Sequence, residues 1–289
     1  MFQDILVTGL VNGGVYALLA VGFSLIFGVA RIVNIAHTAF YMLAAYCFYM
    51  LLVKADLGFA VSGILSVAGV TLLSVICYRL VIEPVREHEA AVLIATIALA
   101  LIFQEVMLFS FGGHYLGIPS TLSGVVSVAG VTIPYQRLLI LAVAAAMLGV
   151  TWTLLYRTRL GLAIRATAND LEVANLMGMN VNRVAMATVA ISVALAAIAG
   201  VVVAPVYVVD PFMWLSPLVT MLAIVVLGGL GSLKGSVIGA LIIGYVESIT
   251  VFALPAGAFL KGAVALSIMV LVLLLRPEGL YGVAFEEER

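Results

Sequence analysis

Long apolar stretches alternate with short polar ones along almost the whole chain. A transmembrane α-helix needs about 20 consecutive apolar residues to cross the hydrocarbon core of a bilayer. Nine stretches meet or approach this length, near residues 5–29, 35–53, 59–81, 91–111, 137–156, 184–204, 212–230, 236–253 and 259–275. The pattern predicts an all-α polytopic membrane protein with about nine transmembrane helices, within a range of about eight to ten, in a single domain that spans residues 1–289.

Composition supports this prediction. The chain is 65% hydrophobic and 9% charged, whereas soluble domains are about half apolar and about a quarter charged. Cys47 and Cys77 lie inside apolar stretches, so we expect small buried side chains rather than a disulfide. The first basic residue is Arg31, so no positive segment precedes the first apolar stretch, and we expect that stretch to remain in the mature protein.

The longest polar interruption, residues 157–183, reads RTRLGLAIRATANDLEVANLMGMNVNR. It contains Arg157, Arg159, Arg165 and Arg183. Loops rich in arginine and lysine stay on the cytoplasmic side of a membrane. The sequence therefore predicts a cytoplasmic loop at 157–183, and counting spans in both directions places the N-terminus outside and the C-terminus in the cytoplasm.

This loop has helical signals of its own. Asn169 and Glu172 have the spacing of a capping box, which predicts a helix that begins at Asp170. Gly178 is placed to end that helix in a left-handed conformation. Leu171, Ala174 and Met177 would share one face. Periodicity alone leaves two interpretations open, a helix that only lies on the membrane surface and a helix that docks onto a partner.

Small residues recur at the spacing that lets helices approach closely in lipid. Gly9 and Gly13 form one such pair, and others are Gly231 with Gly235, Gly235 with Gly239, and Ala196 with Gly200. Packing within one subunit and packing between subunits both fit this pattern. The stretch 112–136 alternates valine and serine, which hints at a short hairpin, either as a connection or as part of a docking face.

No enzyme or metal site is evident. The nearest approach to a phosphate-binding loop, GGLGSLKGS at 228–236, has Gly235 after Lys234 where serine or threonine is required. His37, His88 and His114 are too scattered for metal-ligand spacing or for a catalytic triad. We expect no cofactor, no metal and no ATP hydrolysis by this chain.

Seven polar residues inside apolar stretches are candidates for a solute pathway, because such groups face the interior of a bundle or a water-filled path. They are Asn12, Tyr16, Asn34, His37, Gln104, Glu105 and Glu247. The alternative is hydrogen bonding between helices, the commoner use of asparagine in lipid, or hydration near a span end.

Four blocks of sequence resemble the LivH-type permease subunit of branched-chain amino-acid ATP-binding cassette importers. They are GLVNGGVYALLAVGFSLIFGVARIVNIAHTAFYMLAAY at 9–46, RLGLAIRATANDLEVANLMGMN in the basic loop, VVLGGLGSLKGSVIGALIIGYVES at 225–248 and LRPEGLYG at 275–282. The resemblance implies a bacterial inner-membrane pore subunit that pairs with a second, LivM-like permease, two ATPase subunits and an external solute-binding protein. It also implies an ATPase-coupling role for the basic loop, in which the candidate residues are Gly161, Arg165, Asn169, Glu172, Ala174 and Gly178.

The leading hypothesis is therefore a subunit that translocates branched-chain or other apolar amino acids while ATP is bound and hydrolysed by partner subunits. The same class of importer for urea, short amides or aromatic acids is one alternative. An ion-coupled secondary transporter is another, although such a transporter has no need of a basic helical loop.

Overall fold

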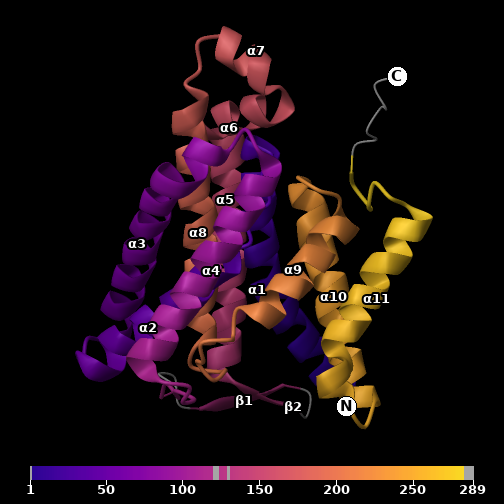
Figure 1. Ribbon diagram of the computed structural model, residues 1–289. Helices are drawn as coiled ribbons and strands as arrows, with labels where there is room; N and C mark the ends of the chain where they lie inside the picture. Colours follow the sequence, from indigo (N-terminus) through magenta and orange to yellow (C-terminus); the bar gives the residue numbers. More distant parts are fainter. Residues whose placement is uncertain (1, 120–123, 129–130, 283–289) are drawn as a thin grey trace.

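The structure, a computed structural model, describes residues 2–119, 124–128 and 131–282, and most of these are helical (Figure 1). The transmembrane part begins with α1 (Phe2–Ala30), α2 (His37–Tyr49), α3 (Phe59–Cys77), α4 (Glu89–Phe111) and α5 (Tyr135–Arg157). Single turns extend two of them, at Met50–Lys54 after α2 and at Tyr78–Ile82 and Glu83–Val85 after α3. Then follow α6 (Arg159–Asn169), α7 (Leu171–Leu176), α8 (Val181–Val203), α9 (Leu215–Gly228), α10 (Leu233–Ala253) and α11 (Gly257–Leu275).

Among the described residues, seven helices are long and apolar enough to cross a membrane: α1, α3 with its extension, α4, α5, α8, α10 and α11. The other two predicted stretches contain α2, with 13 residues, and α9, with 14. Each predicted stretch thus coincides with one helix, and the prediction of an all-α polytopic fold is confirmed.

The two ends of the bundle differ (Figure 1). One end, here called the hairpin end, carries the antiparallel strands β1 (Val125–Val128) and β2 (Val131–Pro134), in which Val126 pairs with Ile133. The hairpin predicted in 112–136 is therefore confirmed. The opposite end, here called the α6–α7 end, carries the two short helices of the basic loop.

Helix α1 lies at the centre of the bundle and packs against α10, α8 and α5. Its close approach to α10 depends on glycine, because a Cβ atom on Gly9 would lie 2.4 Å from the ring of Tyr245. A Cβ on Gly13 would lie 3.0 Å from the side chain of Leu241. The other small-residue pairs also meet helices of this chain, with Gly239 against α9 and Gly200 against α2. These glycines serve packing within the subunit.

Helix α2 begins inside the bundle. After Arg31, which adopts a left-handed φ of 52°, the chain runs back along α1 until Nε2 of His37 lies 3.2 Å from the carbonyl oxygen of Leu19. Ile32 and Asn34 are buried on the way. The predicted stretches 5–29 and 35–53 leave residues 30–34 between them as a connection, but beyond Arg31 this segment packs between helices.

The basic loop contains two helices where one was predicted. Asn169 does not cap a helix but is the last residue of α6, and Asp170 caps α7 by accepting a hydrogen bond from the Val173 amide at 3.0 Å. The capping box was misplaced by one residue because Asn and Asp both favour this position. The predicted stop is confirmed, since Gly178 has a φ of 81° and follows α7 directly.

Candidate functional site

A stripe of polar side chains runs along α1 from the hairpin end. Thr8, Asn12 and Tyr16 are spaced four residues apart and therefore share one face of the helix. Each is bonded to a different part of the chain. Nη1 of Arg137, in the first turns of α5, donates to Thr8 at 3.4 Å, and the hydroxyl of Tyr207, in the segment after α8, donates to Oδ1 of Asn12 at 3.1 Å.

The innermost member of the stripe reaches a buried acid. The Tyr16 hydroxyl donates to Oε2 of Glu247 on α10 at 2.7 Å, and the Thr220 hydroxyl on α9 donates to its Oε1 at 3.1 Å. Glu247 is 2% exposed. A buried carboxylate is tolerated where donors surround it, so these bonds tie α1, α9 and α10 together.

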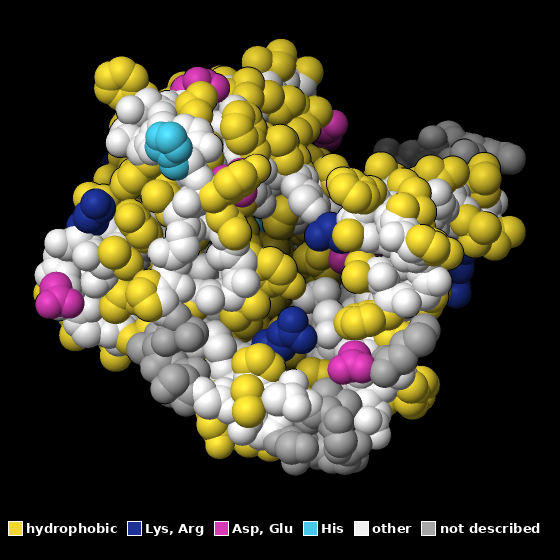
Figure 2. All heavy atoms as spheres, turned by 90° about the horizontal axis from the view of Figure 1, so that it is seen from below, with side chains coloured by type: hydrophobic (Ala, Val, Ile, Leu, Met, Phe, Trp, Pro, Cys, Tyr) yellow, Lys and Arg dark blue, Asp and Glu magenta, His cyan; other side chains and the backbone are white. Residues whose placement is uncertain are grey.

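Sequence reasoning identified Asn12, Tyr16 and Glu247. The structure places Asn12 and Tyr16 on the hairpin half of α1 and brings Glu247 of α10 next to them. It missed Thr8, Arg137, Tyr207 and Thr220, because their partners are far away along the chain; the spacing of Thr8 and Asn12 was the available signal. The bonds also match the alternative of polar contacts between helices. The hairpin end is hollowed near its middle, with charged side chains around the hollow (Figure 2).

Gln104 and Glu105, although adjacent, point in different directions. Gln104 is buried and its Oε1 accepts a hydrogen bond from the indole of Trp214 at 2.9 Å. Glu105 is exposed on the outer surface of α4, where its Oε1 accepts from the Gln104 amide at 3.3 Å. The expectation that Glu105 faces the interior of this bundle is therefore wrong. Successive helical residues point about 100° apart, so only one of the pair faces inward.

Asn34 and His37 lie beside α1 at the start of α2, separate from the polar stripe. His37 is fully buried next to Leu19 and Gly22. Asn34 is 1% exposed, and its Oδ1 makes no hydrogen bond with the described residues. The structure thus places these two predicted residues together at the inner end of α2. No hydrogen bond among the described residues joins either of them to Asn12 or Tyr16.

A cleft runs along the other half of α1 toward the α6–α7 end. Three adjoining cavities form it, with volumes of about 500, 270 and 770 Å³. Leu155 and Leu233 line both the first and the second, and Gly28 and Asn169 line both the second and the third. We call this the α1 cleft, since residues from Val21 to Arg31 form its floor. With about 3.6 residues per turn, Val21 and Gly28 lie on the side of α1 opposite the polar stripe.

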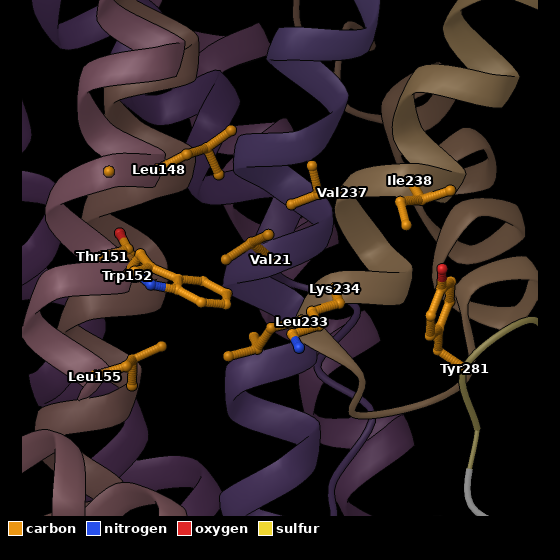
Figure 3. A pocket seen from close by; sticks show the side chains of 11 residues that line it. Val21, Leu148, Thr151, Trp152, Leu155, Leu233, Lys234, Val237, Ile238 and Tyr281 are labelled. Carbon is orange, nitrogen blue, oxygen red and sulfur yellow. The ribbon is translucent and has the colours of Figure 1, made fainter.

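The first cavity of the cleft is almost entirely apolar (Figure 3). Leu148 and Trp152 on α5 face Val237 and Ile238 on α10 across Val21. Lys234 contributes the cationic group, and its Nζ lies 5.9 Å from the centroid of the Trp152 ring. A cavity of this kind is suited to an apolar group that carries a negative charge at one end.

Helix α6 forms one wall of the cleft and is anchored to α5. The Thr158 hydroxyl caps α6 by accepting from the Gly161 amide at 3.0 Å, and Nε of Arg165 donates to the Leu155 carbonyl at 3.1 Å. A Cβ atom on Gly161 would lie 2.2 Å from the Leu154 carbonyl oxygen. Gly161 and Arg165 therefore fix α6 against the end of α5, and Asn169 lines the cleft.

The face that Leu171, Ala174 and Met177 were predicted to share is only partly buried. Ala174 is 2% exposed, so it packs within the chain and cannot be a close contact to a partner. As a coupling residue, Ala174 would therefore act through the packing of α7 against α6 and α8. The most exposed apolar side chains here are Leu176, 86% exposed, and Met177, 77% exposed, while Glu172 is exposed on the same helix.

Comparisons with known proteins agree with this architecture. Residues 5–273 match the family described as the permease component of branched-chain amino acid transport systems. The chain is 33% identical to the high-affinity branched-chain amino acid transport permease BraD of Pseudomonas aeruginosa, over 96% of this chain and 94% of that protein. It is 30% identical to LivH of Escherichia coli, over 97% of this chain and 96% of LivH. Among solved structures, PsaBC of Streptococcus pneumoniae in complex with a Fab has a similar fold, with a TM-score of 0.54, 17% identity and coverage of 96% of this chain and 94% of that one.

Proposed function

The chain belongs to the branched-chain amino acid permease family and is of the LivH type, and from this premise we propose that it is the membrane subunit of an ATP-driven importer for amino acids with apolar side chains. An external solute-binding protein delivers the solute, two ATPase subunits bind and hydrolyse ATP, and a second, LivM-like permease completes the pore. The chain itself binds no cofactor.

One observation carries this proposal: the helices that would dock an ATPase also form a wall of the α1 cleft. Ala168 and Asn169 at the end of α6 line the cleft, and α7 follows directly with Leu176 and Met177 exposed at the tip of the molecule. A nucleotide-driven shift of α7 therefore displaces the cleft wall as a rigid body. A secondary transporter has no use for such an arrangement, which disfavours that alternative.

The solute would pass along α1. The outer mouth would lie at the hairpin end of α1, the half of the helix that carries Thr8, Asn12 and Tyr16, and the α1 cleft serves as the inner one. The two lie on different sides of α1, and alternating access requires that they are not open at the same time. Glu105 is exposed on α4, so any role in the pathway would be at a surface that faces the second permease or water. Asn34 and His37 pack beside α1 between the two regions and help to hold this helix in place.

The proposed orientation follows the distribution of charge. Arg86, Arg157, Arg159, Arg165, Arg183, Lys234 and Arg276 lie in or beside segments at the α6–α7 end, whereas Lys54, Arg137 and Lys261 lie at the hairpin end. The excess of basic residues supports a cytoplasmic α6–α7 end and a cytoplasmic C-terminus in the bacterial inner membrane. The N-terminus and the hairpin would then face the solute-binding protein.

Reconstitution tests the proposal. The chain, its second permease and its ATPases are placed in vesicles, the binding protein is added on the hairpin side, and uptake of labelled leucine is measured with and without ATP on the α6–α7 side. ATP-dependent uptake of leucine is expected. Uptake of urea, acetamide or phenylacetate in place of leucine would favour the same importer with another solute, and uptake driven by an ion gradient without ATP would refute the proposal.

A further inference from the structure

We propose that Lys234 binds the carboxylate of the amino acid, whose apolar side chain occupies the first cavity of the α1 cleft. The inference rests on the proposed function and assigns the solute a specific site within it. It concerns a residue that the solute-pathway predictions did not include.

The cavity has the size and lining that such a solute needs. Its volume is about 500 Å³, and its walls are formed by Leu148, Trp152, Val237 and Ile238 (Figure 3). Burying an apolar side chain there is favourable in proportion to the area removed from water. It adjoins the second cavity at Leu155 and Leu233, and the second adjoins the third at Gly28 and Asn169, in the direction of the α6–α7 end.

Lys234 is an exposed cation at the rim of this cavity. It is the second residue of α10, whose start is capped by Ser232, and a cation is unfavourable at the positive end of a helix. No acidic side chain forms an ion pair with it among the described residues, and its ammonium group lies over the Trp152 ring. An ammonium group without an acidic partner at the rim of an apolar cavity is available to form a charge-assisted hydrogen bond with a carboxylate.

Charge complementarity decides which occupant fits. The helix terminus and the ammonium group add their positive potentials at one end of an apolar cavity, which favours a single negative charge attached to an apolar body. The carboxylate end of a zwitterionic amino acid with a branched apolar side chain meets this requirement, with its ammonium group turned away from Lys234. An anionic phospholipid shares the charge but belongs to the membrane, and the test below separates it from the solute.

A cysteine reporter in the cavity wall measures occupancy directly. Gly149 lines the cavity, and a Cβ atom added there meets nothing within 4 Å, so Gly149→Cys is accommodated. The assembled complex, with Cys47→Ser and Cys77→Ser in this chain, is placed in nanodiscs of neutral phosphatidylcholine. Labelling of this subunit by a small thiol reagent is followed on a gel, with leucine, leucinamide or 4-methylpentanoate present.

Leucine and 4-methylpentanoate, which both carry the carboxylate, are expected to slow labelling, and leucinamide is not. Lys234→Gln should raise the leucine concentration needed for protection at least about tenfold, because a charge-assisted bond is lost. Lys234→Arg should retain protection. Lys261→Gln, at the hairpin end of α11, is the matched control and should leave protection unchanged.

Equal protection by leucine and leucinamide, or full protection in Lys234→Gln, would overturn the assignment. So would labelling that phosphatidylglycerol suppresses before any leucine is added, since the site would then belong to lipid. Leucine uptake by the wild-type complex in vesicles separates the two proposals. ATP-driven uptake there, without protection of the Gly149→Cys reporter, refutes this site alone. Absence of ATP-driven uptake refutes the proposed function.

Discussion

Tyr16 on α1 donates a hydrogen bond of 2.7 Å to Glu247 on α10, which lies 231 residues further along the chain. Thr220 on α9 bonds the other oxygen of the same carboxylate at 3.1 Å. Three helices that are distant in sequence thus meet at one buried acid. The position of α1, which separates the hollow at the hairpin end from the cleft at the other end, depends on this junction.

Removing the Tyr16 hydroxyl should destabilise the protein. In Tyr16→Phe the buried carboxylate keeps one donor, and we expect a loss of about 1–3 kcal/mol. Tyr207→Phe is the control: its bond to Asn12 is 3.1 Å long and its side chain is 49% exposed, so a loss below about 1 kcal/mol is expected. Thermal unfolding in detergent measures both, and equal losses would contradict a special role for the junction.

The proposed orientation predicts which side of the cell can reach each end. Tyr115, near the hairpin, is 79% exposed, and Asn175 lies on exposed α7. In a variant without native cysteines, an impermeant thiol reagent added to intact cells should label Tyr115→Cys and leave Asn175→Cys unlabelled until the cells are opened. The reverse labelling pattern would invert the topology and remove the ATPase contact from α7.

The exposed side chains of α7 should bind the ATPase. Leu176→Asp combined with Met177→Asp places two charges where an apolar contact is proposed, and a loss of about 2 kcal/mol or more is expected for central interface residues. The ATPase should then fail to co-purify with the complex. Asn175→Asp adds a charge to the same helix turn and should retain the ATPase; retention by the Leu176 and Met177 variant as well would place the contact elsewhere.

Gly161 should be required for the placement of α6. In Gly161→Ala the new methyl group would lie 2.2 Å from the carbonyl oxygen of Leu154 and 2.4 Å from that of Leu155, so α6 must move away from α5. Overpacking of this kind costs about 1–3 kcal/mol. Gly149→Ala, with open space around the site, is the control and should not reduce stability. The thermal unfolding midpoint and leucine-stimulated ATP hydrolysis are measured for both, and an unchanged Gly161→Ala variant would show that α6 is not held by this contact.

The apolar pattern alone predicted much of the fold, because every helix in lipid needs its own run of apolar residues. Residues 112–136 likewise revealed their hairpin through alternation. The inward start of α2 could not be predicted, since Ile32 and Asn34 look like a short connection until the packing against α1 is known.

The site was less predictable than the fold. Burial in a helix depends on which face meets a neighbour, so the sequence could not show that Gln104 turns inward and Glu105 outward, or that Ala174 is covered by its own chain. Arg165 looked like a contact for a partner because it is a charged residue in a basic loop, yet its Nε bonds the end of α5. Lys234 stood out only as part of a failed phosphate-loop match, and its cavity depends on α5 and α10 flanking α1.

In the proposed mechanism, nucleotide moves α6 and thereby changes the width of the α1 cleft. Asn169 on α6 and Leu230 in the glycine-rich turn line the same cavity of about 770 Å³ from different elements, so Asn169→Cys and Leu230→Cys carry spin labels across it. Pulsed electron paramagnetic resonance then measures the distance between the labels in the reconstituted complex, without nucleotide and after trapping with ATP and vanadate. A distance distribution that shifts between the two states is the predicted result. An identical distribution in both, in a complex that hydrolyses ATP and takes up leucine, would contradict the account.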